Sequence, residues 1–520
     1  MNGLEAAHYP LNLTSLPRTW TQSSIGGIVS DIQPGFACGA HNRDGVGVPH
    51  LRPMNVDRNG RLELSVLKYV SSDYALRIHC GDVLFNNTNS PELVGKTTSI
   101  AVDLDLAFSN HMTRLRPSEG VDPKFLAHQL HFLWMSGYFR YLCVKHVNQA
   151  SVSSEMLAEK VPTVLPPTRE QIRIREEIEK QFTRLEAGVG ALKRVQANLK
   201  RYRAAVLKAA VEGRLVPTEA ELARREGRSY EPASELLVAQ PLLAVLKKAQ
   251  AGVPVPPKAS SKEPAAPDTT DLPKLPEGWA WTTVECLGVA GEQPVLTGPF
   301  GTSMGRSDFT DSGIPVLTIG CLTHAGINLD KAVFVSRVKA NELDRYRLQT
   351  GDMLFSRMAT VGRAGVITNT LDGALFNYHL MRLRLSRNAV LPGFFMAYVR
   401  GSEAVETYVR DVNHGATRAG INTDQLLSMP VLLPPVAEQQ RIVAEVERRL
   451  SVIDELEMQV ETNLKRAERL RQAILKRAFE GKLVPQDPND EPASMLLERI
   501  RNAGAAGGTA TPGCAPTGSD

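Results

Sequence analysis

The chain reads Leu165-Pro-Pro-Thr-Arg-Glu-Gln-Ile-Arg-Ile174 and, further on, Glu212-Gly-Arg-Leu-Val-Pro217. Both motifs occur a second time, as Leu433-Pro-Pro-Val-Ala-Glu-Gln-Gln-Arg-Ile442 and Glu480-Gly-Lys-Leu-Val-Pro485. Every matched position is displaced by the same 268 residues, the difference between 433 and 165. A repeat of this length determines the architecture before any local pattern is considered. The sequence therefore predicts two similar halves, each ending in a long helix.

Between the two motifs of each copy, the sequence has the periodicity of a helix. Apolar residues recur at steps of three and four from Thr168 to Val211 and from about Ala437 to Phe479, with charged residues between them. This spacing predicts two coiled-coil seams. Gly213 stands where a helix-terminating glycine is expected. Gly188 and Gly190 lie inside the first helix. Each weakens a helix interior by about 1 kcal/mol, so we expect a bend there.

Two amphipathic helices of matching length are expected to pair with each other. Each segment of about 44 residues would be about 65 Å long, and its apolar stripe has to be buried. Because each helix emerges from its own domain, the sequence predicts an antiparallel intrachain pair and a pseudo-twofold internal repeat. Such a body suits a ligand with two spaced contact points, and duplex DNA is such a ligand. The alternative is that the paired helices are only a scaffold.

The regions that precede the helices are predicted to be mixed domains. Short β-like runs are separated by turn residues, for example at Val46–Leu51, Asp82–Phe85 and Ser99–Val102. One helix is expected between Pro123 and Tyr141, because apolar residues there have near-helical spacing.

Two further motifs occur once in each domain. Leu16-Pro-Arg-Thr-Trp20 matches Leu275-Pro-Glu-Gly-Trp279, and Gly81-Asp-Val-Leu-Phe85 matches Gly351-Asp-Met-Leu-Phe355. The predicted fold class is therefore α+β, with two α/β domains joined by two long antiparallel helices. The predicted boundaries are an N-terminal extension at 1–15, a first domain at 16–165, a helical spacer at 166–235, a linker at 236–274, a second domain at 275–433, a second helical spacer at 434–500 and a disordered tail at 501–520.

The bulk properties restrict the class of protein only weakly. The formal net charge of +4 over 520 residues neither requires nor excludes nucleic acid, since binding needs only a local basic face. The six cysteines are scattered without a Cys-x-x-Cys pair, so neither a zinc site nor a disulfide framework is indicated. The chain opens without a basic-then-apolar leader, and no apolar run approaches the ~20 residues of a membrane helix. We expect a soluble, cytoplasmic protein.

Four motifs that occur twice and in the same order resemble those of a known family. They are Leu-Pro-x-x-Trp, Gly-Asp-(Val/Met)-Leu-Phe, Leu-Pro-Pro-x-x-Glu-Gln-x-Arg-Ile and Glu-Gly-(Arg/Lys)-Leu-Val-Pro, spread over roughly residues 16–500. In this pattern the chain resembles the specificity subunit of type I restriction–modification enzymes.

The resemblance implies a DNA-reading subunit without a catalytic centre of its own. Two target-recognition domains would each read one half of a split double-stranded DNA sequence, and the two helices would set the gap between the halves. Two modification subunits would dock on the helices and methylate adenine, and motor–nuclease subunits would join them to cut unmodified DNA. S-adenosylmethionine, ATP and Mg²⁺ are implied for those partner subunits, and no cofactor is implied for this chain.

The residues themselves leave two other classes of function open. One is a coiled-coil adaptor that organises protein partners without reading DNA. The other is a self-contained restriction or methyltransferase enzyme, which is disfavoured because the sequence has no Gly-x-Gly-x-x-Gly, no Walker loop and no Asn-Pro-Pro-aromatic tetrapeptide. His128 and His131 are three residues apart on an expected helix but lack a third ligand, so no metal site is predicted.

The first candidate DNA contact is the polar loop Asn86-Asn-Thr-Asn-Ser-Pro-Glu-Leu-Val-Gly-Lys96, which follows an expected strand. Asparagine can bond bidentately to adenine, and lysine can hold phosphate or guanine, so the candidates are Asn87, Thr88 and Lys96. The alternative is a turn-rich connector in which the asparagines cap their own backbone.

The matching loop of the second domain, Ser356-Arg-Met-Ala-Thr-Val-Gly-Arg363, carries Arg357 and Arg363. Arginine is a strong donor for guanine and phosphate, and the difference between the two loops predicts two different half-sites. Arg418 is a further candidate, in the polar loop His414–Arg418. The alternative there is a loop that only leads into the helix.

Arg114 and Arg382 stand in strand-like Arg-Leu-Arg pairs, which are either solvated strand faces or phosphate contacts. The charged faces of the long helices are candidate surfaces for docking the partner subunits, with a merely solvated face as the alternative. The candidate docking residues are Arg173, Glu177, Arg441 and Glu445.

Overall fold

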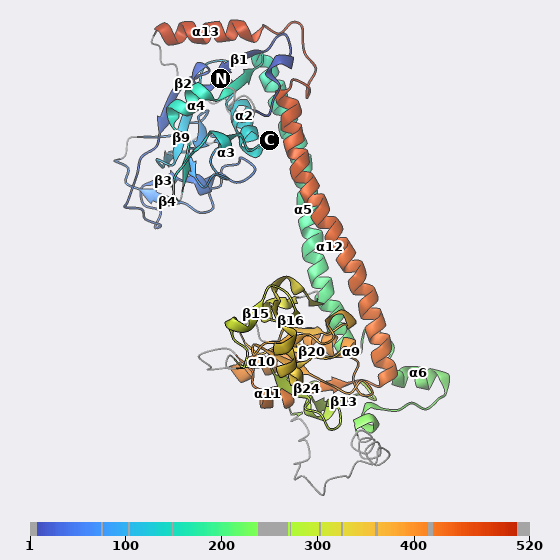
Figure 1. Ribbon diagram of the computed structural model, residues 1–520. Coiled ribbons are helices and arrows are strands. Elements are labelled where there is room, and N and C mark those ends of the chain that lie inside the picture. Colours follow the sequence, from blue (N-terminus) through green and yellow to red (C-terminus); the bar gives the residue numbers. More distant parts are fainter. Residues whose placement is uncertain are drawn as a thin grey trace. The chain divides into compact units, whose positions relative to one another are not determined.

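The computed structural model describes residues 8–73, 76–101, 104–147, 149–237, 269–270, 272–300, 303–323, 326–358, 362–413 and 420–506. The chain divides into two compact units (Figure 1). Unit 1 consists of Met1–Lys193 and Val460–Asp520, and unit 2 consists of Arg194–Gln459. Both divisions fall inside a long helix, so each unit combines a mixed α/β domain with one part of each helix. The mixed α/β fold and the two long helices are confirmed, whereas the pseudo-twofold relation and the domain boundaries stay predictions.

The strands of unit 1 are short. They are β1 (Thr21–Ser24), β2 (Val29–Pro34), β3 (Val48–Leu51), β4 (Lys68–Val70), β5 (Val83–Asn86), β6 (Thr88–Asn89), β7 (Thr97–Ser99), β8 (Ala107–Phe108), β9 (Met112–Pro117), β10 (Val144–Lys145), β11 (Ala150–Ser151) and β12 (Pro162–Leu165). The main sheet is antiparallel, in the order β2-β9-β5-β7. A second sheet, β4-β3-β8, contains the parallel pair β3–β8, and β1 pairs with β12.

Unit 2 has an equivalent set of strands. They are β13 (Ala280–Thr283), β14 (Val295–Thr297), β15 (Phe309–Thr310), β16 (Ile314–Leu317), β17 (Leu322–Thr323), β18 (Gly326–Ile327), β19 (Val333–Val335), β20 (Met353–Ser356), β21 (Ala364–Val366), β22 (Leu375–Phe376), β23 (Leu380–Leu383) and β24 (Pro430–Leu433). The main sheet has the order β14-β23-β20-β21, β16 and β22 form the parallel pair, and β13 pairs with β24. The two units therefore share their strand order as well as their sequence motifs.

The Gly-Asp-x-Leu-Phe motif forms the central strand of each main sheet because both faces of that strand are covered. In β5, Val83 and Phe85 enter one apolar cluster and Leu84 enters another. In β20, Phe355 and Leu354 are divided between two clusters in the same way. Side chains alternate between the two faces of a strand, so an unbroken apolar run is what a strand buried on both faces requires.

Each unit also contains shorter helices, some of which pack on its sheets. Unit 1 has α2 (Pro123–Met135), α3 (Tyr138–Leu142), α4 (Ser154–Lys160) and α13 (Ala493–Ala506), and unit 2 has α6 (Glu219–Glu226), α8 (Arg337–Glu342), α9 (Pro392–Gly401), α10 (Glu403–Asn413) and α11 (Thr423–Leu427). The single helix predicted between Pro123 and Tyr141 is wrong, because Gly137 adopts a φ of +79° and separates α2 from α3. The disordered tail predicted from residue 501 is also wrong up to Ala506, where α13 ends. Residues 507–520 and most of the predicted linker lie outside the described part.

The long helices are α5 (Thr168–Val211) and α12 (Val436–Phe479), within one residue of the bounds predicted from periodicity. The helix assignment of α5 continues through Gly188 and Gly190, so the helix does not fray there. Gly213 has a φ of +68°, and the Arg214 N–H donates to the Ala209 carbonyl at 2.9 Å. This six-to-one bond is that of the predicted Schellman stop.

Within each unit, the long helices contact each other through apolar and charged side chains. In unit 1, Phe182 of α5 shares an apolar cluster with Ile474 of α12, and Arg471 donates to Glu186 at 2.7 Å. In unit 2, Arg203 of α5 donates to Glu457 of α12 at 3.1 Å and also pairs with Asp454. In unit 1 the contact joins the first half of α5 to the last turns of α12, and in unit 2 it joins the last turns of α5 to the middle of α12.

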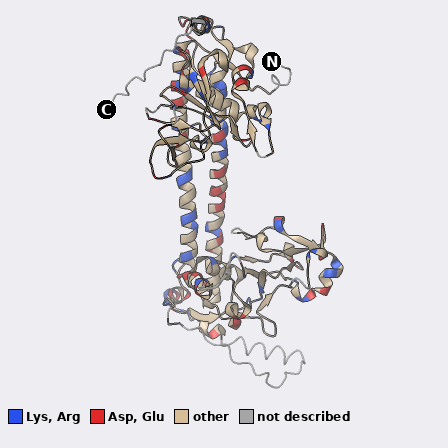
Figure 2. Cartoon of the chain, turned by 90° about the vertical axis from the view of Figure 1, so that its left-hand side faces the viewer, with Lys and Arg blue, Asp and Glu red and all other residues tan. Residues whose placement is uncertain are grey.

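The charges of these segments are complementary in unit 2. From Arg194 to Val211, α5 has five basic and no acidic residues, whereas α12 has three acidic and no basic residues from Asp454 to Gln459. Figure 2 marks these charges along the two helices. The ion pairs of Arg203 therefore join a basic segment to an acidic one.

The glutamine of each Leu-Pro-Pro motif joins a long helix to its domain. The Gln171 amide donates to the Pro166 carbonyl at 2.9 Å, and its oxygen accepts the Asp122 N–H at 2.8 Å. The Gln439 amide likewise donates to the Pro434 carbonyl at 2.9 Å, and its oxygen accepts the Leu391 N–H. These repeated residues therefore satisfy backbone groups at the domain–helix junction.

The tryptophan motif packs at the same junction of unit 2. The Trp279 indole donates to the Glu438 carboxylate at 3.0 Å, and burial raises the pKa of that carboxyl group. A Cβ added at Gly213 would lie 2.6 Å from Pro276, so a larger residue does not fit between this helix end and the Leu-Pro-x-x-Trp motif. In unit 1 the equivalent Gly481 faces Pro17 in the same way.

Within the described part of the chain, no helix is both long and apolar enough to cross a membrane. Four cysteines are free, namely Cys38, Cys143, Cys286 and Cys321, whereas Cys80 is disulfide-bonded. Across those same residues, no three His, Cys, Asp or Glu side chains come together in a way that would hold a metal ion.

Candidate nucleic-acid interface

The candidate residues lie mainly where the strands of the two main sheets turn back. In unit 2, β14 and β20 end at the edge where β23 and β21 begin, as the registers Thr297↔Met381 and Phe355↔Ala364 show. We call residues 298–300, 357–358, 362–363 and 377–379 the loop edge of unit 2. Loops that converge at one edge of a rigid sheet are a common way of positioning binding residues.

Two predicted DNA contacts, Arg357 and Arg363, lie on the loop edge of unit 2. Arg363 is exposed and Arg357 is partly exposed. The Arg357 backbone is fixed, since its N–H donates to the His379 carbonyl at 3.1 Å and its own carbonyl accepts the Ile421 N–H at 2.9 Å. Among the residues that the structure describes, neither guanidinium forms an ion pair. Both charges are therefore available to a ligand, and their contact with DNA stays a prediction.

The third candidate of this domain, Arg418, lies outside the described residues, as does the rest of the loop 414–419. Gly420, the next described residue, forms an isolated β-bridge with Met358. The chain therefore returns from this loop at the loop edge of unit 2.

In unit 1 Asn87 is buried and Thr88 is partly exposed. Asn87 is 7% exposed, and its amide donates to the Asn110 carbonyl at 3.1 Å and to the Thr113 hydroxyl at 2.9 Å. The Thr88 hydroxyl donates to the Asn87 side-chain oxygen at 2.8 Å. The hydrogen-bonding groups of Asn87 hold the turn after β5 together, as the alternative of a turn-rich connector predicts, and a base contact of Asn87 stays a prediction.

Lys96 is also internal, against the prediction of a phosphate or guanine contact. The ammonium group donates to the Pro53 carbonyl at 3.1 Å and to the Val56 carbonyl. Burial lowers the pKa of Lys96. The lysine therefore ties β7 to the loop after β3, and its charge does not reach the surface.

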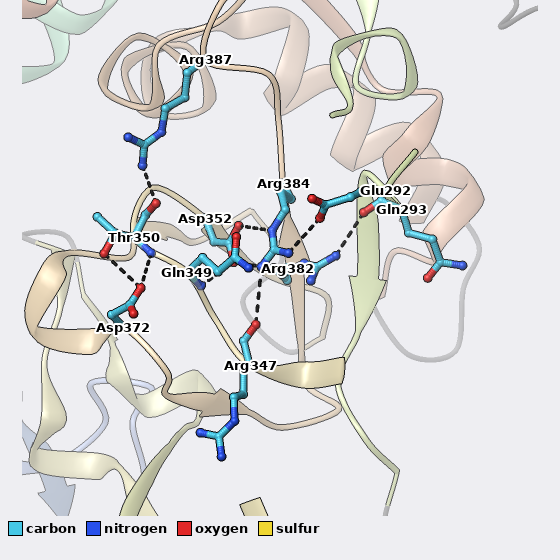
Figure 3. A network of polar contacts seen from close by, with 10 residues as sticks. All are labelled: Glu292, Gln293, Arg347, Gln349, Thr350, Asp352, Asp372, Arg382, Arg384 and Arg387. Atoms are coloured by element: carbon cyan, nitrogen blue, oxygen red, sulfur yellow. Dashed lines mark hydrogen bonds and ion pairs between the residues drawn. The ribbon is translucent and has the colours of Figure 1, made fainter. Parts of the chain in front are cut away.

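The Arg-Leu-Arg pairs form internal clamps, which Figure 3 shows for unit 2. Arg384 donates to both oxygens of Asp352, at 2.8 and 2.7 Å, and to Glu292 at 2.8 Å. These hydrogen bonds raise the pKa of Arg384. The Asp352 carboxylate also accepts the Gln349 N–H, so one motif aspartate holds both a turn and a neighbouring strand.

Arg382 and Arg114 are correspondingly buried, so neither lies on a solvated strand face, and their contact with phosphate stays a prediction. Arg382 is 5% exposed and donates to the Gln293 carbonyl at 3.1 Å, and burial lowers its pKa. Arg114 donates to the Arg77 carbonyl at 2.8 Å and pairs with Asp31. The alternation was typical of a solvated strand face, but in both units the second face of the sheet is covered as well.

Unit 1 has exposed polar residues that sequence reasoning missed. Strand β11 pairs with β6 and with β10, so the turn between β10 and β11 projects beside the loop that follows β5. This turn exposes Lys145, His146 and Val147. The sequence analysis did not identify these residues as candidates.

A basic group lies beside the second sheet of unit 1. His41 and His50 are 2.9 Å apart through ring nitrogens, and Arg52 and Lys68 are close enough to lower the pKa of His41 further. Burial lowers the pKa of His50 to about 4, with a smaller contribution from His41. The sequence did not indicate this group, because its residues come from three separate loops and strands.

The candidate docking residues take part in ion pairs of different kinds. Arg173 pairs with Asp490, and Arg441, at the equivalent position of the second motif, pairs with Glu219 at 2.7 Å. Both arginines therefore hold the segment that follows the opposite long helix against the unit. The other two residues pair only with near neighbours on their own helix: Glu177 with Lys180 and Glu445 with Arg448 and Arg449. Glu177 and Glu445 are partly exposed, and their role in docking stays a prediction.

One cavity of about 440 Å³ lies within unit 1, beside the two histidines of α2. His128 and His131 both line it. Burial lowers the pKa of His128 to about 4 and that of His131 to about 3. His131 accepts the Thr97 N–H, which makes it a core residue that links α2 to β7.

Comparison with known proteins shows what this chain is similar to. Residues 301–466 match the model of the type I restriction modification DNA specificity domain. The chain is 24% identical to the type I restriction enzyme EcoKI specificity subunit of Escherichia coli K12 over 482 residues, 89% of each chain. It is 25% identical to the StySPI specificity subunit of Salmonella potsdam, again over 89% of each chain.

A solved structure has the same fold. It comes from a study titled "Structural basis underlying complex assembly and conformational transition of the type I R-M system". It is 18% identical, with a TM-score of 0.57, and the match covers 91% of this chain and all of that one. The resemblance inferred from the four repeated motifs is thereby confirmed along most of the chain.

Proposed function

We propose that this chain, a DNA specificity subunit of the type I restriction–modification family, reads a bipartite target with one unit for each half-site. The observation that carries this proposal is that the two units share a strand order but present different side chains at the turns of their main sheets. A common scaffold with different loops is what reading two different half-sites requires.

The readout would combine two kinds of contact. In unit 2, Arg357 and Arg363 provide unpaired guanidinium groups for guanine or phosphate, and Arg418, which lies outside the described residues, stays a candidate from the sequence. In unit 1, Lys145 and His146 offer the equivalent exposed charge and hydrogen-bonding groups. Phosphate contacts would fix the position of the duplex, and base contacts would supply the specificity.

The long helices act in this proposal as an antiparallel coiled-coil spacer and as the docking surface for partner subunits. The two helices have equal lengths of 44 residues. Two modification subunits, which would carry S-adenosylmethionine, would dock near Glu177 and Glu445. Motor–nuclease subunits that use ATP and Mg²⁺ would join them, and this chain would have no catalytic role of its own.

The proposal is tested by co-expressing the chain with its modification subunits and mapping methylated adenines in host DNA. We expect a single split sequence. Replacing residues 16–165 by the corresponding domain of a relative should change one half-site only. Methylation that is independent of either half-site would support an adaptor that does not read DNA. Methyl transfer by the purified chain alone would show that it is an enzyme, and either result would contradict the proposal.

A further inference from the structure

Three aromatic rings lie together on the loop edge of unit 2. Phe300 follows β14, and Tyr378 and His379 directly precede β23. The rings of Phe300 and Tyr378 are stacked, with centroids 6.0 Å apart and planes 25° from parallel. The rings of Tyr378 and His379 are 3.9 Å apart. The short β14–β23 register, which joins Thr297 to Met381, brings these sequence-distant rings into contact.

This cluster is exposed, in contrast to the aromatic residues in the core of unit 2. Phe300 is 57% exposed and Tyr378 is 36% exposed, whereas Phe355, Phe376 and Phe394 are fully buried. Burying a phenylalanine side chain stabilises a fold by about 1.5–3 kcal/mol, and Phe300 forgoes most of that. An exposed apolar group held in a fixed geometry is typical of a binding surface.

The neighbouring charges indicate which ligand the aromatic cluster contacts. The Arg357 backbone N–H donates to the carbonyl of His379. The backbone of this arginine is therefore bonded to the residue that carries the third ring of the cluster. Arg363 lies at the start of β21 on the same edge. Unpaired guanidinium groups beside apolar rings match the major groove of DNA, where arginine bonds to guanine and phenylalanine contacts the thymine C5-methyl group.

We propose that Phe300 and Tyr378 contact the C5-methyl group of a thymine in the half-site that unit 2 reads. This inference rests on the proposed function, since it assigns one base contact within the DNA interface. The rings supply an apolar surface that distinguishes thymine from cytosine, while Arg357 and Arg363 bond to polar base edges or phosphates. The ring contact with His379, tilted by 38°, helps to hold the Tyr378 ring in place.

The equivalent positions of unit 1 carry different chemistry. Pro34 of β2 and Thr297 of β14 occupy matching places in the two main sheets. Three residues further on, unit 1 has Ala37 where unit 2 has Phe300. Unit 1 also has Asn110 at the position of Tyr378, three residues before the matched register position. The methyl contact is therefore a property of unit 2 alone.

The test removes one methyl group at a time from the DNA. Once methylation mapping has identified the target, each thymine of both half-sites is replaced singly by deoxyuridine, which lacks only the C5-methyl group. Binding of these duplexes to the complex of the chain with its modification subunits is measured by fluorescence anisotropy. Because one buried methyl group corresponds to about a fourfold change in affinity, at least one thymine of a single half-site should show a penalty of about that size.

The variants Phe300→Ala and Tyr378→Ala should bind the thymine duplex more weakly and lose this penalty. Tyr378→Phe should retain it, since the ring and not the hydroxyl makes the contact. Val338→Ala, which truncates an exposed apolar residue on α8, should leave binding and the penalty unchanged. The melting temperature of each complex shows whether a variant is folded.

The outcomes separate this inference from the proposed function. Binding by the wild type that ignores both half-sites would refute the proposed function itself. Sequence-specific binding in which no deoxyuridine causes a penalty, or in which the penalty persists in Phe300→Ala, would overturn only the methyl contact. A half-site without thymine would also overturn it. So would variants that lose the modification subunits while DNA discrimination is unchanged, because the rings would then serve a protein partner.

Discussion

At the residue scale, the repeated motifs are explained by internal bonds. Asp82 and Asp352 stand at the same place in their motifs, and each accepts hydrogen bonds from an arginine on the adjacent strand, Arg116 and Arg384. Each aspartate also caps the turn that precedes its own strand. The Gly-Asp-x-Leu-Phe motif is therefore needed for the fold, and we expect the residues that contact DNA to lie outside it.

The first prediction concerns this clamp. Asp352→Asn should destabilise unit 2 by about 3 kcal/mol, because Arg384 would be left as a buried charge without its main carboxylate. Urea denaturation measures the change. Glu292→Gln is the matched control, since this partner of Arg384 is 42% exposed and should contribute about 1 kcal/mol or less. Equal effects of the two substitutions would contradict the assignment of Asp352 as the central residue.

The second prediction concerns the stability of unit 1 at acid pH. Burial lowers the pKa values of His50 and His128 to about 4 and that of His131 to about 3. Between the ordinary value of about 6.5 and these lowered values, the unfolded chain binds more protons than the folded chain. The stability of unit 1 should thus be fully present above about pH 6.5 and decline as the pH falls towards 4.

The check is a series of urea denaturation midpoints between pH 7 and pH 4. His128→Gln removes one of the three buried histidines and should make the decline less steep. A midpoint that stays constant across this range in the wild type would show that these histidines are protonated equally in both states.

Residue positions were the hardest feature to predict from sequence. Lys96 was predicted to contact phosphate or guanine because lysine can hold either group, and Arg114 and Arg382 were predicted to lie on solvated strand faces or to contact phosphate. The carbonyl and carboxylate partners that they find come from residues tens of positions away, such as Pro53 and Asp31. No local pattern reveals such pairings.

At the element scale, the long helices were predicted well because three independent signals agree. Periodicity gives the body, a proline pair marks the start, and a glycine in the left-handed region marks the end. The predicted helix from Pro123 to Tyr141 failed because its apolar pattern continues across Gly137, where only the backbone conformation reveals the break. Whether the apolar stripes form a coiled coil stays a prediction.

The third prediction concerns two glycines, one inside α5 and one just after its end. Gly188 lies in the interior of α5 with open space around its Cα, so Gly188→Ala should stabilise the protein by about 1 kcal/mol. Gly213 has a φ of +68° and faces Pro276, so Gly213→Ala should destabilise it by at least about 1 kcal/mol. Thermal unfolding of both variants measures the contrast. Two changes of the same sign would contradict the proposed roles of these glycines.

At the scale of the whole molecule, the internal repeat predicted two similar halves before any element was assigned. The equivalent strand orders of the two units agree with it. The DNA target could not be predicted, because loops of different length and composition interrupt the common scaffold. Bases are read by side chains whose reach depends on loop geometry, and the shape of the DNA contributes as well.

The equal lengths of α5 and α12 lead to the last prediction. A seven-residue insertion in both helices, placed so that the apolar spacing continues, adds two turns and about 10 Å. At about 3.4 Å per base pair, the proposed spacer role predicts a gap between half-sites that is longer by about three base pairs. Both half-site sequences should be unchanged, because no residue of either mixed α/β domain is altered. Methylation mapping of the lengthened protein in a host with its modification subunits measures the gap directly.

A matched control inserts the same seven residues into the segment between α6 and β13, which lies outside both helices and should leave the gap as it was. An unchanged gap in the lengthened protein, with methylation retained, would show that the distance between half-sites is set by contacts other than the helices.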